Sequence, residues 1–307
     1  MQICVYCFQS NAACEQCGGI GVIRDASLPD LRIVKDIQTF ASKETPLHAS
    51  AIPELIKCAL RPAMIHLFPS DYESSEAADT GSLTHVGVAD WHRNKDIVAA
   101  IQAMTGAQSR FPQGSLAEAT AMFYLYSQDE RNAQAEIAKD KEGRLLLEYP
   151  LSAVLQAAES DPTKAPIYIV GTLDQVRVVN GRKRVFDLKT SKRPAYEQSD
   201  MYVYQIATYS FMVSVALGEP VPMGGLIMPR HYKSDPANLQ AHVEFSHKFS
   251  DVLTFVNGVR FAVAHVRAGH VHPAPGPHCR YCPFGPTSNC APMLRAISDE
   301  KHQIRRP

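Results

Sequence analysis

The sequence predicts an α/β fold, because segments with strand periodicity alternate along the chain with segments of helical periodicity. The clearest strand signal covers 167–179, which is rich in apolar and β-branched residues. Asn180-Gly181 then precedes a second apolar segment, and these two residues tolerate the positive φ that a tight hairpin turn needs. The clearest helix signal covers 48–68, where apolar residues recur at helical spacing.

Composition and charge narrow the class of protein. The 307 residues allow one large domain or two smaller ones, and 45% hydrophobic with 20% charged residues is typical of a soluble globular protein. There is no apolar run of the roughly 18 to 20 residues that cross a membrane and no signal-peptide pattern, so we expect a cytoplasmic protein. The formal net charge is zero. This excludes a protein that coats DNA by bulk charge, and any DNA contact must be local.

Residues 1–35 form a candidate module of their own. They hold two CxxC pairs, and each pair can offer two thiolates to one ion. Tetrahedral zinc is the natural occupant of a site with four cysteine ligands. Zinc would also supply folding energy that so short a segment cannot obtain from a core. The alternatives are a redox pair or four reduced thiols in a flexible tail. We therefore expect a zinc knuckle at 1–35, with the ligands Cys4, Cys7, Cys14 and Cys17.

The predicted helix at 48–68 carries a lone cysteine, Cys58. Ser50 is a suitable N-cap and Pro53 fits the first turn. A lone buried cysteine is usually a small core residue. The remaining predicted elements are a polar loop at 69–81, a helix from near Ser82 that carries His85, a mostly helical stretch at 94–138 broken around 106–114, a strand at 144–154, a helix at 200–217, strands at 223–228 and 239–245, and a helix at 252–268.

The predicted hairpin carries three charged side chains that can converge. Asp174 lies on the first arm, while Asp187 and Lys189 are two residues apart on the second arm and so share one face of the strand. Carboxylate oxygens are hard ligands for Mg²⁺ or Mn²⁺, and a neighbouring lysine can orient a water or stabilise negative charge. This combination suits metal-dependent hydrolysis of a phosphodiester. The alternative is a surface hairpin in which these residues form cross-strand pairs.

Four short motifs, taken in order, resemble a known family. GTLD at 171–174 and FDLKTSK at 186–192 resemble motifs II and III of the PD-(D/E)XK nuclease superfamily, in the form seen in RecB-like exonucleases. Gln205 and Tyr209 match the QxxxY helix motif of that group, and GSLTH at 81–85 resembles its motif I. The segment around Cys58 is similar to the helix that carries the first cluster cysteine in the CRISPR-associated RecB-like group with an iron–sulfur site. The resemblance covers roughly residues 49–292.

The resemblance implies a restriction-endonuclease-like core, in which a central mixed sheet is flanked by helices. The nuclease domain would span 36–307, with 94–138 as a helical insertion. Lys189 would position or activate the attacking water. Glu148 would line the site as a supporting residue; the alternative is an ordinary carboxylate on an edge strand. Gln205 and Tyr209 would contact the DNA or the metal-bound water. The implied ligands of Mg²⁺ or Mn²⁺ are His85, Asp174, Asp187 and the backbone carbonyl of Leu188.

A second cysteine group lies near the C-terminus. Cys279, Cys282 and Cys290 occupy a Pro/Gly-rich segment and leave a cysteine-only site one ligand short. Because the N-terminal quartet is complete in itself, Cys58 is the natural fourth ligand. The resemblance favours a [4Fe–4S] cluster, which accepts four cysteines, and zinc is the alternative. Such a cluster would connect the first helix to the end of the nuclease domain.

Basic residues gather around the hairpin, beside the proposed metal site. We expect them to contact phosphates; the alternative is a turn whose cations point into water. The residues proposed to bind DNA are Arg177, Lys183, Arg184, Lys192 and Arg193.

These observations predict a metal-dependent exonuclease that cleaves DNA with a free end, in repair, recombination or phage- or CRISPR-type DNA metabolism. One alternative is a structure-specific endonuclease on the same core. Another is a non-catalytic DNA-binding adaptor. The sequence has no GxxxxGK[ST] motif, so helicase activity would come from a partner protein. A recombinase or another DNA-processing protein is a further candidate partner, and no membrane partner is expected.

Overall fold

The computed structural model describes residues 2–3, 22–23, 37–67, 75–192, 199–232, 241–245 and 248–269. Strands β1 (Gln2–Ile3) and β2 (Val22–Ile23) pair antiparallel. The predictions that fall outside the described residues concern Cys4, Cys7, Cys14, Cys17, Arg193, Cys279, Cys282 and Cys290. The zinc and iron–sulfur sites therefore stay predictions.

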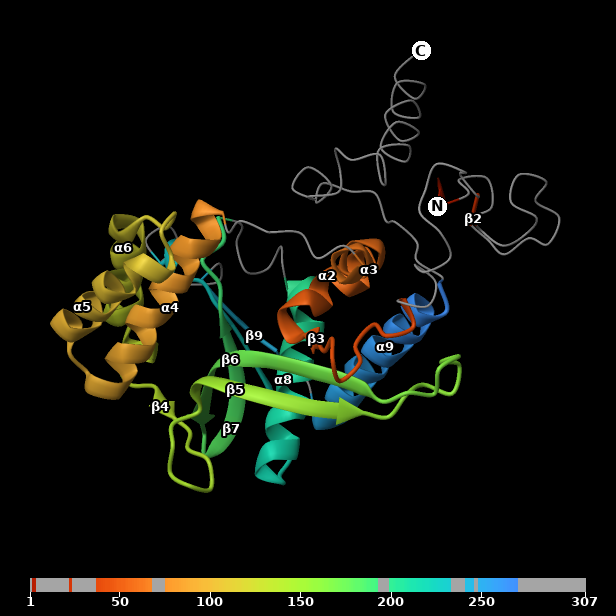
Figure 1. Ribbon diagram of the computed structural model, residues 1–307. Helices are drawn as coiled ribbons and strands as arrows, with labels where there is room; N and C mark the ends of the chain where they lie inside the picture. The colour runs from red at the N-terminus through yellow and green to blue at the C-terminus, as the bar shows by residue number, and fades with distance from the viewer. Residues whose placement is uncertain are drawn as a thin grey trace, which may run out of the picture.

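Seven strands of the described part form one mixed sheet around β6 (Ile167–Val179). One edge of β6 pairs antiparallel with β5 (Leu147–Leu155) and β4 (Glu136–Ile137). The other edge pairs with β3 (Leu47–His48), parallel, and with β7 (Arg182–Leu188), antiparallel. The sheet continues from β7 to β8 (Met223–Ile227), parallel, and then to β9 (His242–Glu244), antiparallel (Figure 1). The predicted α/β class with a central mixed sheet is confirmed.

The β6–β7 hairpin has the predicted turn. Asn180 and Gly181 have φ values of 51° and 72°, the positive range that a tight primed turn requires. The register pairs Val179 with Arg182 at the turn and Gln175 with Phe186 at the far end. The local sequence was sufficient here because the turn chemistry and the apolar arms favour the same structure.

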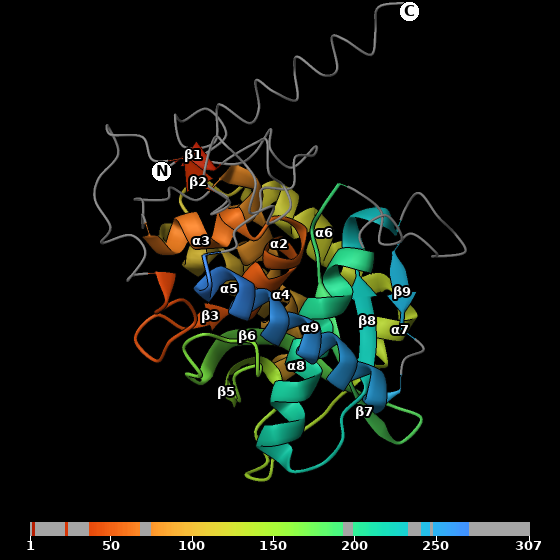
Figure 2. The same cartoon turned by 90° about the vertical axis from the view of Figure 1, so that its right-hand side faces the viewer.

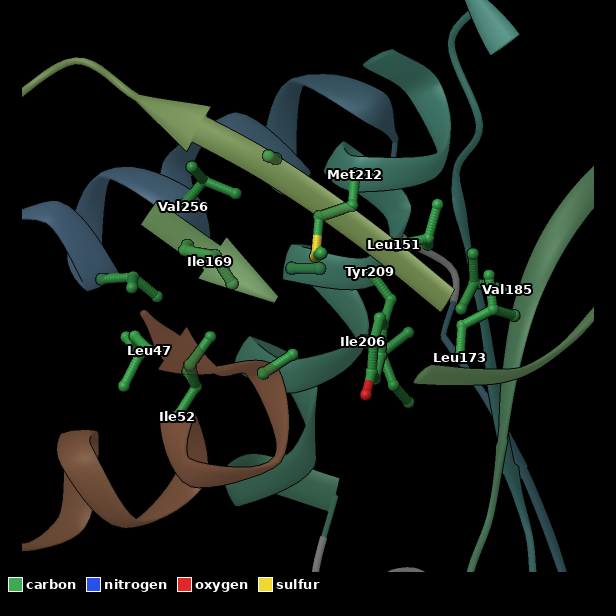
Figure 3. Packing of buried hydrophobic residues seen from close by; sticks show 14 of the residues in the cluster. Leu47, Ile52, Leu151, Ile169, Leu173, Val185, Ile206, Tyr209, Met212 and Val256 are labelled. Atoms are coloured by element: carbon green, nitrogen blue, oxygen red, sulfur yellow. The ribbon is translucent and has the colours of Figure 1, made fainter. Parts of the chain in front are cut away.

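Helices pack on both faces of the sheet. Helices α8 (Ser199–Leu217), α9 (Phe249–Arg267) and α2 (Ile52–Lys57) enclose one apolar core with the sheet (Figures 1 and 3). A second core lies under α4 (Glu76–Asn94), α5 (Ile97–Ala107) and α6 (Leu116–Gln128). We call residues 76–133 the cap; they end with α7 (Glu130–Ala133), and Figure 1 shows α4, α5 and α6 grouped apart from α8 and α9.

The alternation of side chains along β7 connects the two cores. Val185 belongs to the core under α8 and α9, whereas Phe186 and Leu188 belong to the core under the cap. Asp187 lies between these two cap-facing residues, so its side chain points to the α8 face. Figure 2, turned by 90°, shows α9 crossing in front of α8, and the two helices are in contact. Asp187, the carboxylate that β7 carries, is thereby directed at α8.

The single helix predicted for 48–68 is wrong. The segment forms β3, a 3₁₀ turn (Ala49–Ala51), α2 and then α3 (Leu60–Leu67), and the backbone at Cys58 is extended with φ −153° and ψ 89°. Pro62 supplies the reason. It has no N–H to donate to the carbonyl of Cys58, and its ring would collide with that carbonyl in a continuous helix. The spacing of apolar residues alone does not reveal a helix break of this kind.

Helix α4 begins earlier than predicted. The segment 69–81 was expected to be a loop, but α4 starts at Glu76. Ser75 is the N-cap, because its Oγ accepts a hydrogen bond from the backbone N–H of Ala78 at 3.3 Å. Acidic side chains at Glu76 and Asp79 favour a helix N-terminus, so the acidity that suggested a loop belongs to the first turn.

The break expected within 94–138 is present, as a 3₁₀ turn (Gln108–Arg110) and a connection between α5 and α6. Among the helices of the described residues, none has both the length and the apolar character needed to cross a bilayer.

Candidate functional site

The site lies where β6 and β7 separate. Backbone pairing between the two strands ends at Gln175 and Phe186. Beyond that pair, the Oδ2 of Asp174 accepts a hydrogen bond from the backbone N–H of Leu188 at 2.5 Å. A side chain thus replaces the next backbone bond, and the two strands diverge around the Asp174 carboxylate. The pleat of β6 is irregular at the same place, because Leu173 and Val176 are three residues apart yet face the same core.

A histidine and two carboxylates meet at this fork. The Nδ1 of His85 lies 3.1 Å from the Oε1 of Glu148 and 3.3 Å from the Oδ1 of Asp174. Burial alone lowers the pKa of His85, but the two carboxylates outweigh burial and hold the pKa well above its usual range. The three residues come from α4, β5 and β6. One ligand atom from each lies within 4.8 Å of the other two.

The backbone of Glu148 is unusual. Its φ is 46°, the left-handed region that non-glycine residues rarely adopt in a strand. The residues on either side pair regularly with β6, Leu147 with Gln175 and Tyr149 with Leu173. The irregularity is therefore confined to Glu148, and it accompanies the contact between the Glu148 carboxylate and His85.

Asp187, which is buried, and Lys189, which is half-buried, form an ion pair on the α8 side of the fork. The Nζ of Lys189 lies 2.8 Å from the Oδ2 of Asp187. Burial raises the pKa of the Asp187 carboxyl to about 6, and the negative charge of Asp174 adds to this against the opposing effect of Lys189. Burial lowers the pKa of Lys189, but Asp187, Tyr202 and Asp174 outweigh it and raise the pKa above its usual range. This arrangement holds Lys189 as an ammonium group, which is a hydrogen-bond donor.

Helix α8 supplies the two residues of the QxxxY motif. The Nε2 of Gln205 donates to the Oδ1 of Asp187 at 3.5 Å, and the hydroxyl of Tyr209 donates to the carbonyl of Thr172 at 2.8 Å. Tyr209 therefore supports the backbone of β6 next to the fork. Gly171 makes this possible, because a Cβ at that position would lie 2.9 Å from the Tyr209 hydroxyl.

The residues after β7 are held by groups that the sequence analysis did not identify. The Nε of Arg230 donates to the carbonyl of Thr190 at 3.0 Å, and its Nη1 lies 2.5 Å from the Oε1 of Glu118 in α6. His231 contacts the carbonyl of Ser191 at 3.2 Å. These bonds tie the Lys189 segment to both β8 and the cap. The sequence offers no signal for them, since Arg230 follows an ordinary strand and its partners are distant in the chain.

The fork opens into a cleft of about 890 Å³. One face of α4 forms a wall of it, including Gly81, Ser82 and His85. Glu148, Leu188 and Lys189 line the cleft on the sheet side. The predicted residues that the structure brings to the cleft or the fork beneath it are His85, Glu148, Asp174, Asp187, Leu188, Lys189, Gln205 and Tyr209.

The basic residues of the hairpin have other surroundings. Arg177 is 4% exposed and donates to the hydroxyl of Tyr126, to the Oδ1 of Asn132 and to the Oε1 of Gln175, beneath the cap. Its guanidinium is therefore buried among protein groups and is not exposed to contact a phosphate. Burial follows from β6 alternation, which directs Arg177 to the cap side with Gln175.

Two further hairpin cations are engaged with protein groups. Lys183 pairs with Glu219 at 2.6 Å, and Arg184 donates to the carbonyl of Phe245 at 2.7 Å. Both lie towards the turn, at the opposite end of β7 from Lys189. Lys192 is exposed beyond Lys189. Among the cations predicted to bind DNA that lie within the described residues, Lys192 is the one that faces solvent near the site.

A divalent cation fits the donor set at the fork. Three carboxylates converge there, and His85 adds a nitrogen; carboxylate oxygens suit Mg²⁺ and Mn²⁺, and imidazole is also a known ligand of divalent metals. Burial is the main reason that the pKa of Asp187 is raised, and the negative charge of Asp174 adds to it; a cation bound between the two carboxylates would relieve that repulsion. Asp187 itself contacts Lys189 and lies outside the group formed by His85, Glu148 and Asp174.

Cys58 is a free, half-buried cysteine between α2 and α3. Its predicted partners lie beyond the described residues, so its role as a cluster ligand stays a prediction.

The fold and the site together define a class: an α/β protein whose carboxylates, histidine and lysine suit a metal-dependent nuclease. A family model described as the PD-(D/E)XK nuclease superfamily matches residues 47–287, most of the chain. The chain belongs to the PD-(D/E)XK nuclease superfamily. A solved structure titled "Crystal structure of SSO0001" has 14% sequence identity, with 82% of this chain and 91% of that chain covered and a TM-score of 0.35. No curated protein matches the sequence significantly.

Proposed function

We propose that this protein is a Mg²⁺- or Mn²⁺-dependent deoxyribonuclease that removes nucleotides from DNA with a free end. The observation that supports the proposal most is the convergence, at one fork of the sheet, of the His85–Glu148–Asp174 group and the Lys189–Asp187 pair. A structural role alone does not require three carboxylates at one point, one of them on the strained Glu148. Buried charges of this kind cluster at functional sites.

The proposed roles separate metal binding from positioning of the water and the phosphate. His85, Glu148 and Asp174 hold the metal ion, with Asp187 and the carbonyl of Leu188 as further ligands. When bound, the ion polarises the scissile phosphate and lowers the pKa of a water.

Lys189, held as an ammonium, orients the attacking water and stabilises charge that develops on the phosphate. Gln205 keeps Asp187 in place, and Tyr209 fixes the backbone before Asp174.

The alternatives differ in what the site does with DNA. A structure-specific endonuclease would use the same residues. A DNA-binding adaptor would not need them, and the complete set of Asp174, Asp187 and Lys189 disfavours it. We further propose that the chain belongs to the RecB-like group and acts in the cytoplasm, with a helicase, a recombinase or another DNA-processing protein as partner.

Two structural metal sites complete the proposal. Residues 1–35 would hold zinc through Cys4, Cys7, Cys14 and Cys17. The nuclease domain, 36–307, would hold a [4Fe–4S] cluster through Cys58, Cys279, Cys282 and Cys290. Zinc and iron analysis of anaerobically purified protein distinguishes this cluster from a second zinc site.

The decisive experiment digests linear end-labelled DNA and closed circular DNA with anaerobically purified protein, with Mn²⁺ and with EDTA. An exonuclease degrades the linear DNA, leaves the circle intact and stops in EDTA. Cleavage of the circle would assign the endonuclease instead. Lys189→Ala should lower the rate by a factor on the order of 10² or more, because it removes one preorganised charge. Cleavage by Lys189→Ala at the wild-type rate would contradict the assigned role.

A further inference from the structure

The cleft extends well beyond the fork, along α4. Residues of α4 that line the cleft recur every three or four positions, so one face of the helix forms the wall. Arg93 lies on this face eight residues after His85, which places it about 12 Å further along the helix axis. Arg110, from the turn between α5 and α6, lines the same cleft.

Arg93 and Arg110 are the cations of this wall that no carboxylate neutralises. Both side chains are exposed, and neither forms an ion pair within the described residues. The Arg110 guanidinium lies 5.4 Å from the ring centre of Phe111, which also lines the cleft. Lys183 and Arg184, in contrast, are each paired with a glutamate. The free positive charge of the cleft is therefore on the cap.

Asp90 is the acidic residue on the same stretch of α4. Its Oδ1 accepts a hydrogen bond from the Nδ2 of Asn94 at 3.1 Å, and the residue lines the cleft. The charges along the α4 wall beyond the site are thus Arg93 and Arg110 against Asp90. This balance favours an anionic ligand.

We propose that Arg93 and Arg110 bind phosphates of the DNA strand that leads away from the reacting phosphate along α4. The proposal rests on the proposed function and adds the place where the substrate backbone is held. At the 3.4 Å rise per nucleotide of one strand in B-form DNA, about 12 Å corresponds to three or four nucleotides. Such contacts position the strand without reading its sequence.

The test measures binding of a fluorescent DNA oligonucleotide in EDTA, which keeps the DNA intact, over a series of salt concentrations. Arg93→Ala and Arg110→Ala should each weaken binding by about tenfold, the size expected for a lost charge-assisted hydrogen bond. Each should also lower the slope of log K against log[salt] by about 0.7 to 0.9, since one phosphate contact is lost. Asp90→Asn should tighten binding.

Arg182→Ala is the matched control. Arg182 is an exposed arginine without an ion pair in the part of the chain that the structure describes, and it lies at the turn end of β7, about 23 Å from Lys189 at the strand rise. Arg182→Ala removes one positive charge, as the other two variants do, but at a position remote from the cleft. It should therefore leave DNA binding unchanged. Arg93→Lys should retain most of the affinity, and thermal unfolding checks that the variants fold.

Cleavage kinetics with the metal ion separate this inference from the proposed function. Arg93→Ala and Arg110→Ala should raise KM and leave kcat close to wild type, because both residues are remote from the reacting atoms. If wild-type protein cuts DNA while both variants bind and cut like wild type, the inference is overturned and the function stands. If wild-type protein neither binds nor cuts DNA, both are overturned.

Discussion

Glu148 shows how a single residue is held against its local preference. A glutamate with a φ of 46° costs about 1–3 kcal/mol relative to an ordinary strand conformation. A glycine would adopt this conformation without strain. Glutamate, unlike glycine, provides a carboxylate, and its Oε1 lies 3.1 Å from the Nδ1 of His85 in the proposed metal site. We interpret the strain as the consequence of placing a third oxygen donor at the fork.

This interpretation predicts an unusual order of stability. Glu148→Gly and Glu148→Ala both remove the carboxylate, but only glycine fits the left-handed backbone. The glycine variant should be more stable than the alanine variant by about 1 kcal/mol, the reverse of the order in a regular strand. Urea unfolding monitored by circular dichroism measures the difference. Equal stability, or a more stable alanine variant, would show that the residue is not held in that conformation.

At the scale of elements, the approach of α4 to the Lys189 segment depends on Gly81. A Cβ on Gly81 would lie 2.8 Å from the Oγ1 of Thr190, the residue after Lys189. The carbonyl of the same threonine is held by Arg230, which also binds Glu118 of α6. Thr190 is therefore positioned by the cap from two directions, and the cap helices contribute to the placement of Lys189.

Gly81→Ala should lower kcat by about 10- to 100-fold, because a small displacement of a catalytic group has an effect of this size. Adding Thr190→Ala removes the Oγ1 and leaves a contact of 4.0 Å, so the double variant should recover activity. Gly106→Ala is the control, since a Cβ at that position of α5 meets nothing within 4 Å. It should gain about 1 kcal/mol of stability from helix propensity and keep its activity. A double variant as slow as Gly81→Ala would exclude the proposed contact as the cause.

Elements whose signals are local could be predicted from the sequence. The β6–β7 hairpin follows from Asn180-Gly181 between apolar arms, and α8 ends before Gly218, whose φ is 70°. The break at Cys58 also has a local cause, Pro62, which apolar periodicity does not detect. The burial of Arg177 has none, because its partners Tyr126 and Asn132 belong to cap helices distant in the sequence.

At the scale of the whole molecule, the site is assembled from elements that are distant along the chain. His85 comes from α4, Glu148 from β5, Asp174 from β6 and Gln205 from α8. Motif resemblance named these residues individually. The fork that brings them together depends on how the strands diverge. The exposure of Arg93 and Arg110 depends on how the cap helices pack. Residue types and spacing specify neither.

The central claim is that the fork binds the metal ion that the proposed nuclease requires. The most direct measurement is Mn²⁺ binding, followed by electron paramagnetic resonance of free Mn²⁺, to wild type, Asp174→Asn and Glu142→Gln. Asp174→Asn keeps an oxygen that can accept the Leu188 N–H, while Glu142→Gln removes one charge from a side chain that is 66% exposed and outside the cleft. The account predicts that Asp174→Asn binds Mn²⁺ at least about tenfold more weakly than wild type, within the range seen when metal-site groups are altered, and that Glu142→Gln binds it equally well. Equal Mn²⁺ affinity of wild type and Asp174→Asn would contradict the account.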